Sequence, residues 1–154
     1  MSAPKSVVKL SKNGIEYTSS VDKCQYYIFE LSRRALMDVG RYVSKMFVNS
    51  YYAIFKKNKG WARKAIRYKV FSSKNTKYPR IQIGLKSEYG FYSFFQEFGS
   101  SKTKKYGLLT KSVEDNIAEI VKIESQYLSG LEDEAKALSM IESENDYEGG
   151  ADDE

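Results

Sequence analysis

The sequence contains no histidine and one cysteine, Cys24, among its 154 residues. Histidine is the commonest general base and the commonest metal ligand, so its absence argues against acid–base and metal-dependent catalysis. A lone cysteine excludes a disulfide framework and favours a reducing compartment. Cys24 is set among apolar residues, so we predict that it is buried in a helix and is a poor nucleophile. We expect a protein that is not an enzyme and needs no cofactor or metal.

Long apolar runs are also missing. No run approaches the roughly 18 residues that a membrane span needs, and "MSAPKSVVKL" lacks the apolar core of a signal peptide. We expect a soluble, intracellular protein with no membrane partner. A hydrophobic content of 42% is enough for one core. The expected organisation is a single domain over residues 1–142 and an acidic flexible tail over 143–154, where "SENDYEGGADDE" is too polar to order itself.

Acidic residues are scarce in the first 111 residues. These carry 23 Lys and Arg against 6 Asp and Glu, a net charge of +17, whereas residues 112–154 carry 2 against 14, a net charge of −12. Each cluster taken alone is compatible with a solvated face. A separation this complete raises the question of where the two signs meet.

Hydrophobic periodicity predicts the first two elements. "VVKLSKNGIEYT" (residues 7–18) places two β-prone runs around Asn13-Gly14, which suits a type I′ hairpin turn. Residues 21–56 change to helical spacing, with apolar positions at Cys24, Tyr27, Ile28, Leu31, Ala35, Val39, Val43, Met46, Phe47, Tyr51 and Ile54. Such a helix spans roughly 50 Å, so we expect part of its stripe to face a neighbour; the alternative is that the whole stripe is core. Gly40 inside this helix indicates a kink or a close helix crossing.

Two further strands lead to a fold class. "AIRYKVF" and "RIQIGLK" are strand-like runs separated by polar residues, with Pro79 at a strand start, so we predict an antiparallel pair. Together with the hairpin they give a small sheet. The predicted fold class is α+β, with a long N-terminal helix packed on a small antiparallel sheet, a short aromatic helix and a C-terminal helix.

The aromatic helix is predicted from "YGFYSFFQEFG". Helical spacing places four phenylalanines on one side of it: Phe91, Phe94, Phe95 and Phe98. Gly99 is predicted to end this helix in a left-handed conformation. Glu97 lies in the last turn, where the helix dipole disfavours an acid, so it requires a compensating partner. We interpret Glu97, Phe98 and Gly99 as a brace for the loop from Ser100 to Tyr106. The alternative is a solvent-facing glutamate.

The C-terminal part is predicted to be helical. From Leu109 onward, helical spacing predicts one helix that ends near Gly130, with positions at Val113, Ile117, Ile120, Val121, Glu124 and Leu128. "LEDEAKALSMIE" continues it as a further amphipathic piece. The loop sequence "GSSKTKK" lacks the second glycine of a phosphate-binding loop and follows a helix, so we expect no nucleotide site.

The order of these elements resembles the neck proteins of tailed phages, which are also called tail-completion, head–tail joining or minor tail proteins. The matching residues are "YGFYSFFQEFGSS" at 89–101 and "YGLLTKSVEDNIAEI" at 106–120, and the resemblance covers about residues 20–130. The loop of that family usually carries prolines before the last helix. Here Tyr106, Gly107, Leu108 and Leu109 stand without them.

The resemblance implies a structural subunit of the virion, made in the host cytoplasm and placed at the head–tail junction. It implies a homo-oligomeric ring, a hexamer or a dodecamer, through which DNA passes with transient contact. The implied partners are head-closure or connector proteins on one side and tail-terminator or tail-tube proteins on the other.

In such a ring, we expect basic residues of one subunit to contact acidic residues of the next. The candidate subunit or DNA contacts are Lys56, Lys57, Lys59, Arg63, Lys64, Arg67, Lys102, Lys104 and Lys105. The candidate acidic interface is formed by Glu114, Asp115, Glu132, Asp133 and Glu134.

The alternative function is that of a basic nucleic-acid-binding protein. The cations between Lys56 and Lys69 are interleaved with Trp61 and Tyr68, a composition that attracts phosphates and stacks on bases. The aromatics of "RYKVF" are more simply explained by strand packing, and no recognised nucleic-acid-binding module accompanies them.

Overall fold

The computed structural model describes residues 8–12, 15–56, 59–72 and 78–142 and has the predicted α+β class. The predicted acidic tail, 143–154, lies outside the described residues. In chain order the elements are β1 (Val8–Lys12), β2 (Ile15–Ser19), α1 (Val21–Phe55), α2 (Lys59–Ala65), β3 (Ile66–Phe71), β4 (Arg80–Leu85), α3 (Ser87–Phe98), α4 (Leu108–Glu114), α5 (Ile117–Leu128), the 3-10 helix η1 (Ser129–Glu132) and α6 (Glu134–Glu142).

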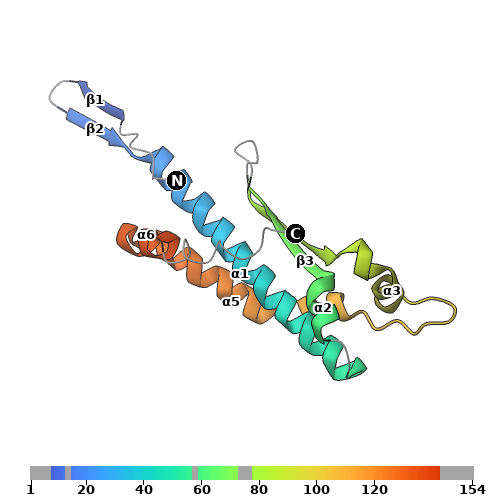
Figure 1. Cartoon of the computed structure of the whole chain (residues 1–154). Helices are drawn as coiled ribbons and strands as arrows, with labels where there is room; N and C mark the ends of the chain where they lie inside the picture. The colour runs from blue at the N-terminus through green and yellow to red at the C-terminus, as the bar shows by residue number, and fades with distance from the viewer. Residues whose placement is uncertain (1–7, 13–14, 57–58, 73–77, 143–154) are drawn as a thin grey trace.

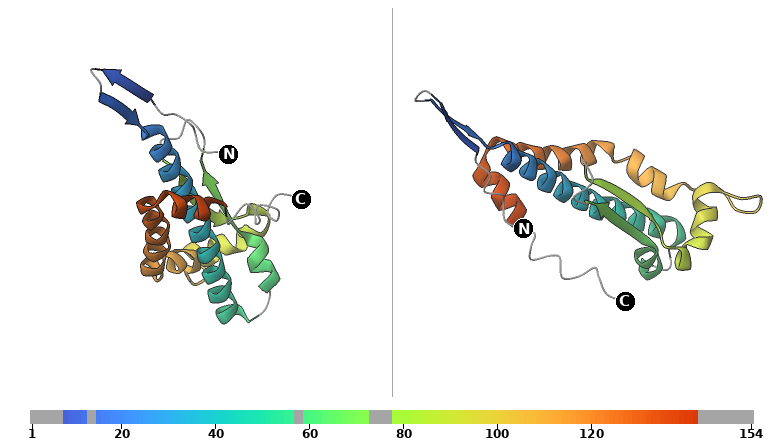
Figure 2. Two further views of the ribbon diagram at one scale, coloured as in Figure 1. Left: turned by 90° about the vertical axis from the view of Figure 1, so that its left-hand side faces the viewer. Right: turned by 90° about the horizontal axis from the view of Figure 1, so that it is seen from above.

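The strands form two separate antiparallel pairs, not one sheet as predicted. The hairpin prediction is confirmed in its pairing, with Lys12 opposite Ile15, although its turn residues lie outside the described ones. Figures 1 and 2 show β1 and β2 projecting beyond the N-terminal end of α1, away from β3 and β4. The hairpin therefore contributes nothing to the sheet on which α1 packs.

Helix α1 is the axis of the fold. The β3–β4 pair packs on one side of it, while α5 and α6 lie along another (Figures 1 and 2). The predicted stripe is buried at Tyr27, Leu31, Ala35, Val39, Val43, Phe47 and Tyr51. Cys24, Ile28 and Ile54 are exposed, which corrects their prediction as part of the stripe. Cys24 and Ile54 lie near the ends of α1, and Ile28 lies one position after buried Tyr27, so its side chain points away from the covered face.

Two hydrophobic clusters hold these elements on α1. The first joins the C-terminal half of α1 to α2, β3 and α4 through Phe47, Val48, Tyr51, Ala62, Ile66 and Leu108. The second joins the N-terminal half to α6 through Tyr27, Leu31, Ala137 and Ile141. Burial of a large apolar side chain contributes about 1.5–3 kcal/mol, so each cluster is a substantial part of the stability.

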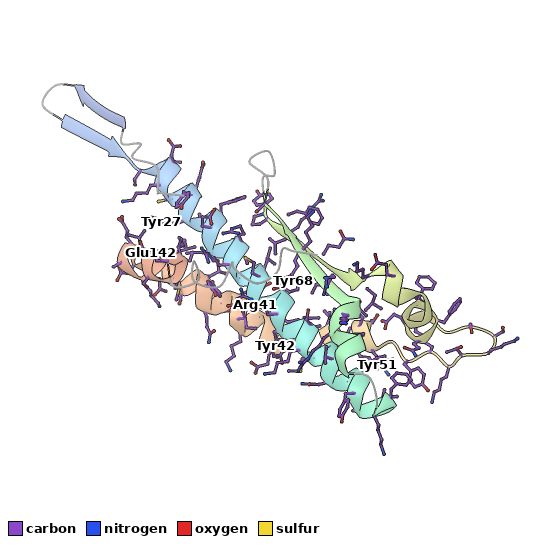
Figure 3. The ribbon with its side chains drawn as sticks, viewed as in Figure 1. Tyr27, Arg41, Tyr42, Tyr51, Tyr68 and Glu142 are labelled. Atoms are coloured by element: carbon purple, nitrogen blue, oxygen red, sulfur yellow. The ribbon has the colours of Figure 1, made fainter. Side chains whose placement is uncertain are left out.

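At Gly40 the sheet packs closely on α1, whereas the sequence indicated a kink or a close helix crossing. A Cβ atom at Gly40 would lie 2.5 Å from Cδ2 of Tyr68 and 2.8 Å from Cδ1 of Ile81. Figure 3 shows Tyr68 between β3 and α1. The absence of a side chain at this position lets the tyrosine ring pack directly on the helix backbone.

The predicted helix from Leu109 to Gly130 is divided into α4 and α5 by a turn at Asp115 and Asn116. Asn116 Nδ2 donates to the Ser112 carbonyl oxygen at 3.1 Å, and Asn116 Oδ1 accepts from the hydroxyl of Tyr42 at 3.0 Å. Asparagine side chains that bond in this way compete with continued helix formation. The turn lets α5 run along α1, where Tyr127 donates to Asp38.

We predict that Gly40→Val lowers the free energy of unfolding by about 2 kcal/mol or more, because the new side chain must displace the Tyr68 ring. Gly84→Val is the matched control: a Cβ there meets nothing within 4 Å, and Gly84 pairs with Arg67 in the same sheet. The control should change stability by no more than about 0.5 kcal/mol. Denaturant unfolding measures both, and equal stabilities of the two variants would contradict the close packing.

Candidate subunit-interaction site

The Glu97 carboxylate joins the aromatic helix to the first turn of α4. Glu97 is buried and accepts hydrogen bonds from the amide of Leu109 at 2.9 Å, the amide of Thr110 at 2.9 Å and the hydroxyl of Thr110 at 2.6 Å. The residue before α4 is Gly107, which has no side chain to cap the helix. Glu97, ten residues before Gly107 in the sequence, therefore caps α4. Its negative charge at the N-terminus of α4 also interacts favourably with the helix dipole.

The environment of Glu97 holds this carboxylate in its charged form. Desolvation by burial opposes ionisation, but the hydrogen bonds from Thr110, Leu109 and Leu108 outweigh it, so the pKa of Glu97 lies below its ordinary value. The sequence predicted a compensating partner for Glu97, such as loop amides or a basic side chain, and a role for Glu97 as a brace of the loop from Ser100 to Tyr106. In the structure, the hydrogen bonds of the carboxylate go to the helix that follows the loop.

The loop after α3 is closed by backbone hydrogen bonds and by the Ser100 side chain. The amide of Tyr106 donates to the Gln96 carbonyl oxygen at 2.7 Å, and the Ser100 hydroxyl oxygen accepts from the amide of Thr103 at 3.0 Å. Gly99 has φ 82° and ψ 166°, which is an extended conformation with positive φ and not the predicted left-handed helical one. Only glycine adopts it readily. The roles of Gln96 and Gly107 were not predicted, although a glycine directly before a helical run is a usable signal in the sequence.

Two phenylalanines of α3 are exposed beside this loop. Phe94 is 59% exposed and Phe98 is 62% exposed, and their ring centroids are 4.7 Å apart. Phe98 therefore does not brace the loop, which corrects the prediction. The predicted lysines of the loop are exposed as well, and Figure 1 shows the loop extending away from α1. We call this set the aromatic–lysine surface: Phe94, Phe98, Lys102, Lys104 and Lys105.

An apolar row lies on the exposed side of α5. Ile117, Val121 and Leu128 share one helical face and are 55%, 52% and 53% exposed. Exposed Val113 precedes them and exposed Leu131 follows them. We call these five residues the α5 strip.

All five predicted acidic interface residues are exposed, and four of them flank α5 in sequence. Glu114 and Asp115 lie directly before α5, and Glu132 and Asp133 lie shortly after it. The fifth, Glu134, is engaged within the chain, because it pairs with Lys23 and accepts a hydrogen bond from Tyr27 at 3.2 Å. The row of Ile117, Val121 and Leu128 is therefore flanked in sequence by two exposed acids on each side.

The remaining predicted basic contacts lie around α2 and the sheet. Exposed residues here are Lys56 at the end of α1, Arg63 and Lys64 in α2, and Arg67 and Lys69 in β3. Lys57 lies outside the described residues, as do the side chains of Lys59 and Trp61. Tyr68 faces α1, which agrees with the interpretation of the aromatics of "RYKVF" as strand packing and not with base stacking.

A cavity of about 200 Å³ opens between α1, α5 and Pro79. Its lining is mainly apolar and is formed by Leu31, Ser32, Ala35, Leu36, Pro79, Glu124, Tyr127 and Leu128. In the part of the chain that the structure describes, no group of three or more Cys, Asp or Glu side chains is arranged to hold a metal ion. Within the same residues, every helix is too short or too polar to cross a membrane.

We predict that Glu97→Gln lowers the free energy of unfolding at pH 7 by about 1–3 kcal/mol, because an amide donor then faces the donors of α4. Since the pKa of Glu97 is depressed on folding, its contribution is present above the ordinary carboxyl pKa and is lost as the pH falls through the folded value. The difference between wild type and variant should therefore shrink below about pH 4.3.

Glu88→Gln is the control for this experiment, because Glu88 is an exposed carboxylate of the same helix. Thermal unfolding over a pH series compares the three proteins. A wild-type advantage over Glu97→Gln that stays constant down to pH 2 would argue against a charged cap.

Comparison of the chain with family models, with curated proteins and with solved structures gives no match.

Proposed function

We propose that the chain is a structural subunit of the head–tail connector, or neck, of a tailed phage. Copies of it form a ring that joins the connector on the capsid side to the tail terminator or tail tube and lets DNA pass. The resemblance of residues 89–120 to neck proteins is one support. The order of elements is a second, since a long helix, two strands and an aromatic helix ending in Glu97-Phe98-Gly99 precede the C-terminal helices.

The observation that carries the proposal is the large apolar surface that one copy leaves exposed. Exposed apolar patches beyond a few hundred Å² are unusual on monomers and mark interaction sites. Here both the aromatic–lysine surface and the α5 strip expose about half or more of several large side chains. A stable interface buries about 800 Å² on each partner. Neighbouring copies that cover these two surfaces bury apolar area that contributes to such an interface.

Charge separation supports contact between copies. Within the described residues, the acidic residues near α5 lie apart in sequence from the cations of α2, β3 and the loop. An exposed ion pair contributes only about 0–1 kcal/mol, so the apolar residues provide most of the affinity and the charges set the register.

We predict that the purified chain assembles into a closed oligomer at low salt, and that assembly weakens between about 0.05 and 0.5 M salt, where the Debye length falls below about 5 Å. Sedimentation equilibrium and native mass spectrometry measure the mass. Neutralising the acids beside the α5 strip (Glu114→Gln, Asp115→Asn, Glu132→Gln, Asp133→Asn) should weaken assembly and flatten its salt dependence. A wild-type chain that stays monomeric at every concentration and salt would refute the proposed function.

A second candidate function is nucleic-acid binding, which the outer face of the β3–β4 pair favours. Residues 39–87 contain 13 Lys and Arg and no Asp or Glu. Arg67, Lys69 and Arg80 are exposed on this pair, and the cationic groups of Lys69 and Arg80 lie 5.5 and 5.6 Å from the ring centroid of Phe71. A two-stranded ribbon of this kind fits the major groove of DNA.

For this candidate we predict a salt-sensitive complex with duplex or single-stranded DNA in mobility-shift assays. Replacing Arg67, Lys69 and Arg80 with glutamine should weaken binding and reduce the salt slope by up to about 3, one unit per lost phosphate contact. Replacing Lys102, Lys104 and Lys105 with glutamine is the matched control, with the same loss of charge elsewhere. Absence of any complex at 0.05 M salt would eliminate this candidate.

A further inference from the structure

We infer that neighbouring copies meet head to tail, with the aromatic–lysine surface of one copy seated on the α5 strip of the next. This inference rests on the proposed function, since it names the two faces that make the ring contact. It commits to a second copy of this chain as the partner of both surfaces.

Both surfaces have apolar side chains at their centre, and the charged residues beside them have opposite signs. Phe94 and Phe98 offer a pair of contacting aromatic rings tilted by 48°, and Ile117, Val121 and Leu128 offer an aliphatic row. The loop beside the rings carries three exposed lysines, whereas two acids stand before the row and two shortly after it. Packing of the two phenylalanine rings on the aliphatic row places the lysines of the loop near the carboxylates at the ends of the row.

A symmetric contact is disfavoured by the same charges. Pairing two aromatic–lysine surfaces would bring six lysines together, and pairing two α5 strips would bring their bordering acids together. Like charges placed opposite each other at an interface cost several kcal/mol. A heterologous contact avoids this, and it is the kind that generates rings.

The loop that presents the lysines is shaped before any partner arrives. Gly99 turns the chain, and the Ser100 hydroxyl oxygen accepts a hydrogen bond from the amide of Thr103. The carbonyl oxygen of Gln96 accepts a hydrogen bond from the amide of Tyr106 at the end of the loop. A preorganised loop loses less entropy on binding than a loose one.

The size of the strip suits an aromatic pair. Ile117 and Leu128 are 11 positions apart, which is about 17 Å along a helix. The two neighbouring rings therefore cover part of the row and leave its ends to the charged residues. Within each subunit, the Glu97 cap joins α3 to α4, so it fixes the angle between the two surfaces. That angle determines whether successive head-to-tail contacts close into a ring.

Two surface variants test the pairing. Phe94→Ser/Phe98→Ser removes the aromatic pair and Ile117→Ser/Val121→Ser removes the centre of the α5 strip. All four side chains are exposed, so both variants should keep the wild-type circular dichroism and unfolding midpoint. Ile28→Ser is the matched control, because Ile28 is an exposed apolar residue of α1 outside both surfaces.

Each variant alone should be monomeric under conditions where wild type and Ile28→Ser assemble. Mixed in equal amounts, the two variants should form a dimer of one copy of each and nothing larger, because one intact contact remains between them. A symmetric dimer of either variant alone, or a mixture that stays monomeric, would overturn the pairing. If both variants assemble as wild type does, the ring survives and the pairing is wrong; a monomeric wild type refutes both.

Charge reversal provides a second test. Lys102→Glu/Lys104→Glu/Lys105→Glu and, separately, Glu114→Lys/Asp115→Lys/Glu132→Lys/Asp133→Lys should each weaken assembly by about tenfold or more at 0.05 M salt, from like charges across the contact. A chain that carries both sets should recover most of this loss. If that chain assembles no better than either set alone, the lysine loop does not face the acids and the pairing is wrong.

Discussion

Burial of the α1 stripe is the constraint on which the other elements depend. The helix is about 52 Å long at 1.5 Å per residue, and neither the β3–β4 pair nor the α5–α6 segment covers it alone. Tyr27 and Leu31 bind α6 at one end, Phe47 and Tyr51 bind α2, β3 and α4 at the other, and Gly40 admits the sheet between them. The shorter elements are thereby fixed relative to each other through one rigid helix.

Glu97 connects this scaffold to the surfaces proposed for assembly. A buried carboxylate is stable here because three donors of α4 compensate its desolvation. The same interaction holds the end of α3 against the first turn of α4, across the lysine loop that connects them. A structural acid at this position accounts for its buried charge without any catalytic role, and it links the orientation of one candidate surface to that of the other.

Local periodicity was sufficient to predict the hairpin, α1, the strand pair and α3, because each is specified by its own residues. Contacts between distant residues decided the rest. The turn at Asn116 depends on Tyr42, which is 74 positions away, and the packing of Tyr68 depends on Gly40. The charged residues of the candidate site could be predicted from the sequence. Ile117, Val121 and Leu128 have the spacing of a core face, and only the placement of α5 on α1 shows that they remain exposed.

Site-directed cross-linking tests directly whether the aromatic–lysine surface of one copy contacts the α5 strip of the next. In a Cys24→Ser background, one chain carries Phe98→Cys and another carries Val121→Cys, and a short thiol-specific bifunctional reagent joins cysteines that lie close together. Head-to-tail contact predicts a covalent dimer when the two chains are mixed, and little or none with either chain alone. Efficient cross-linking of either chain to itself, or none in the mixture while the oligomer persists, would show that the two surfaces do not meet.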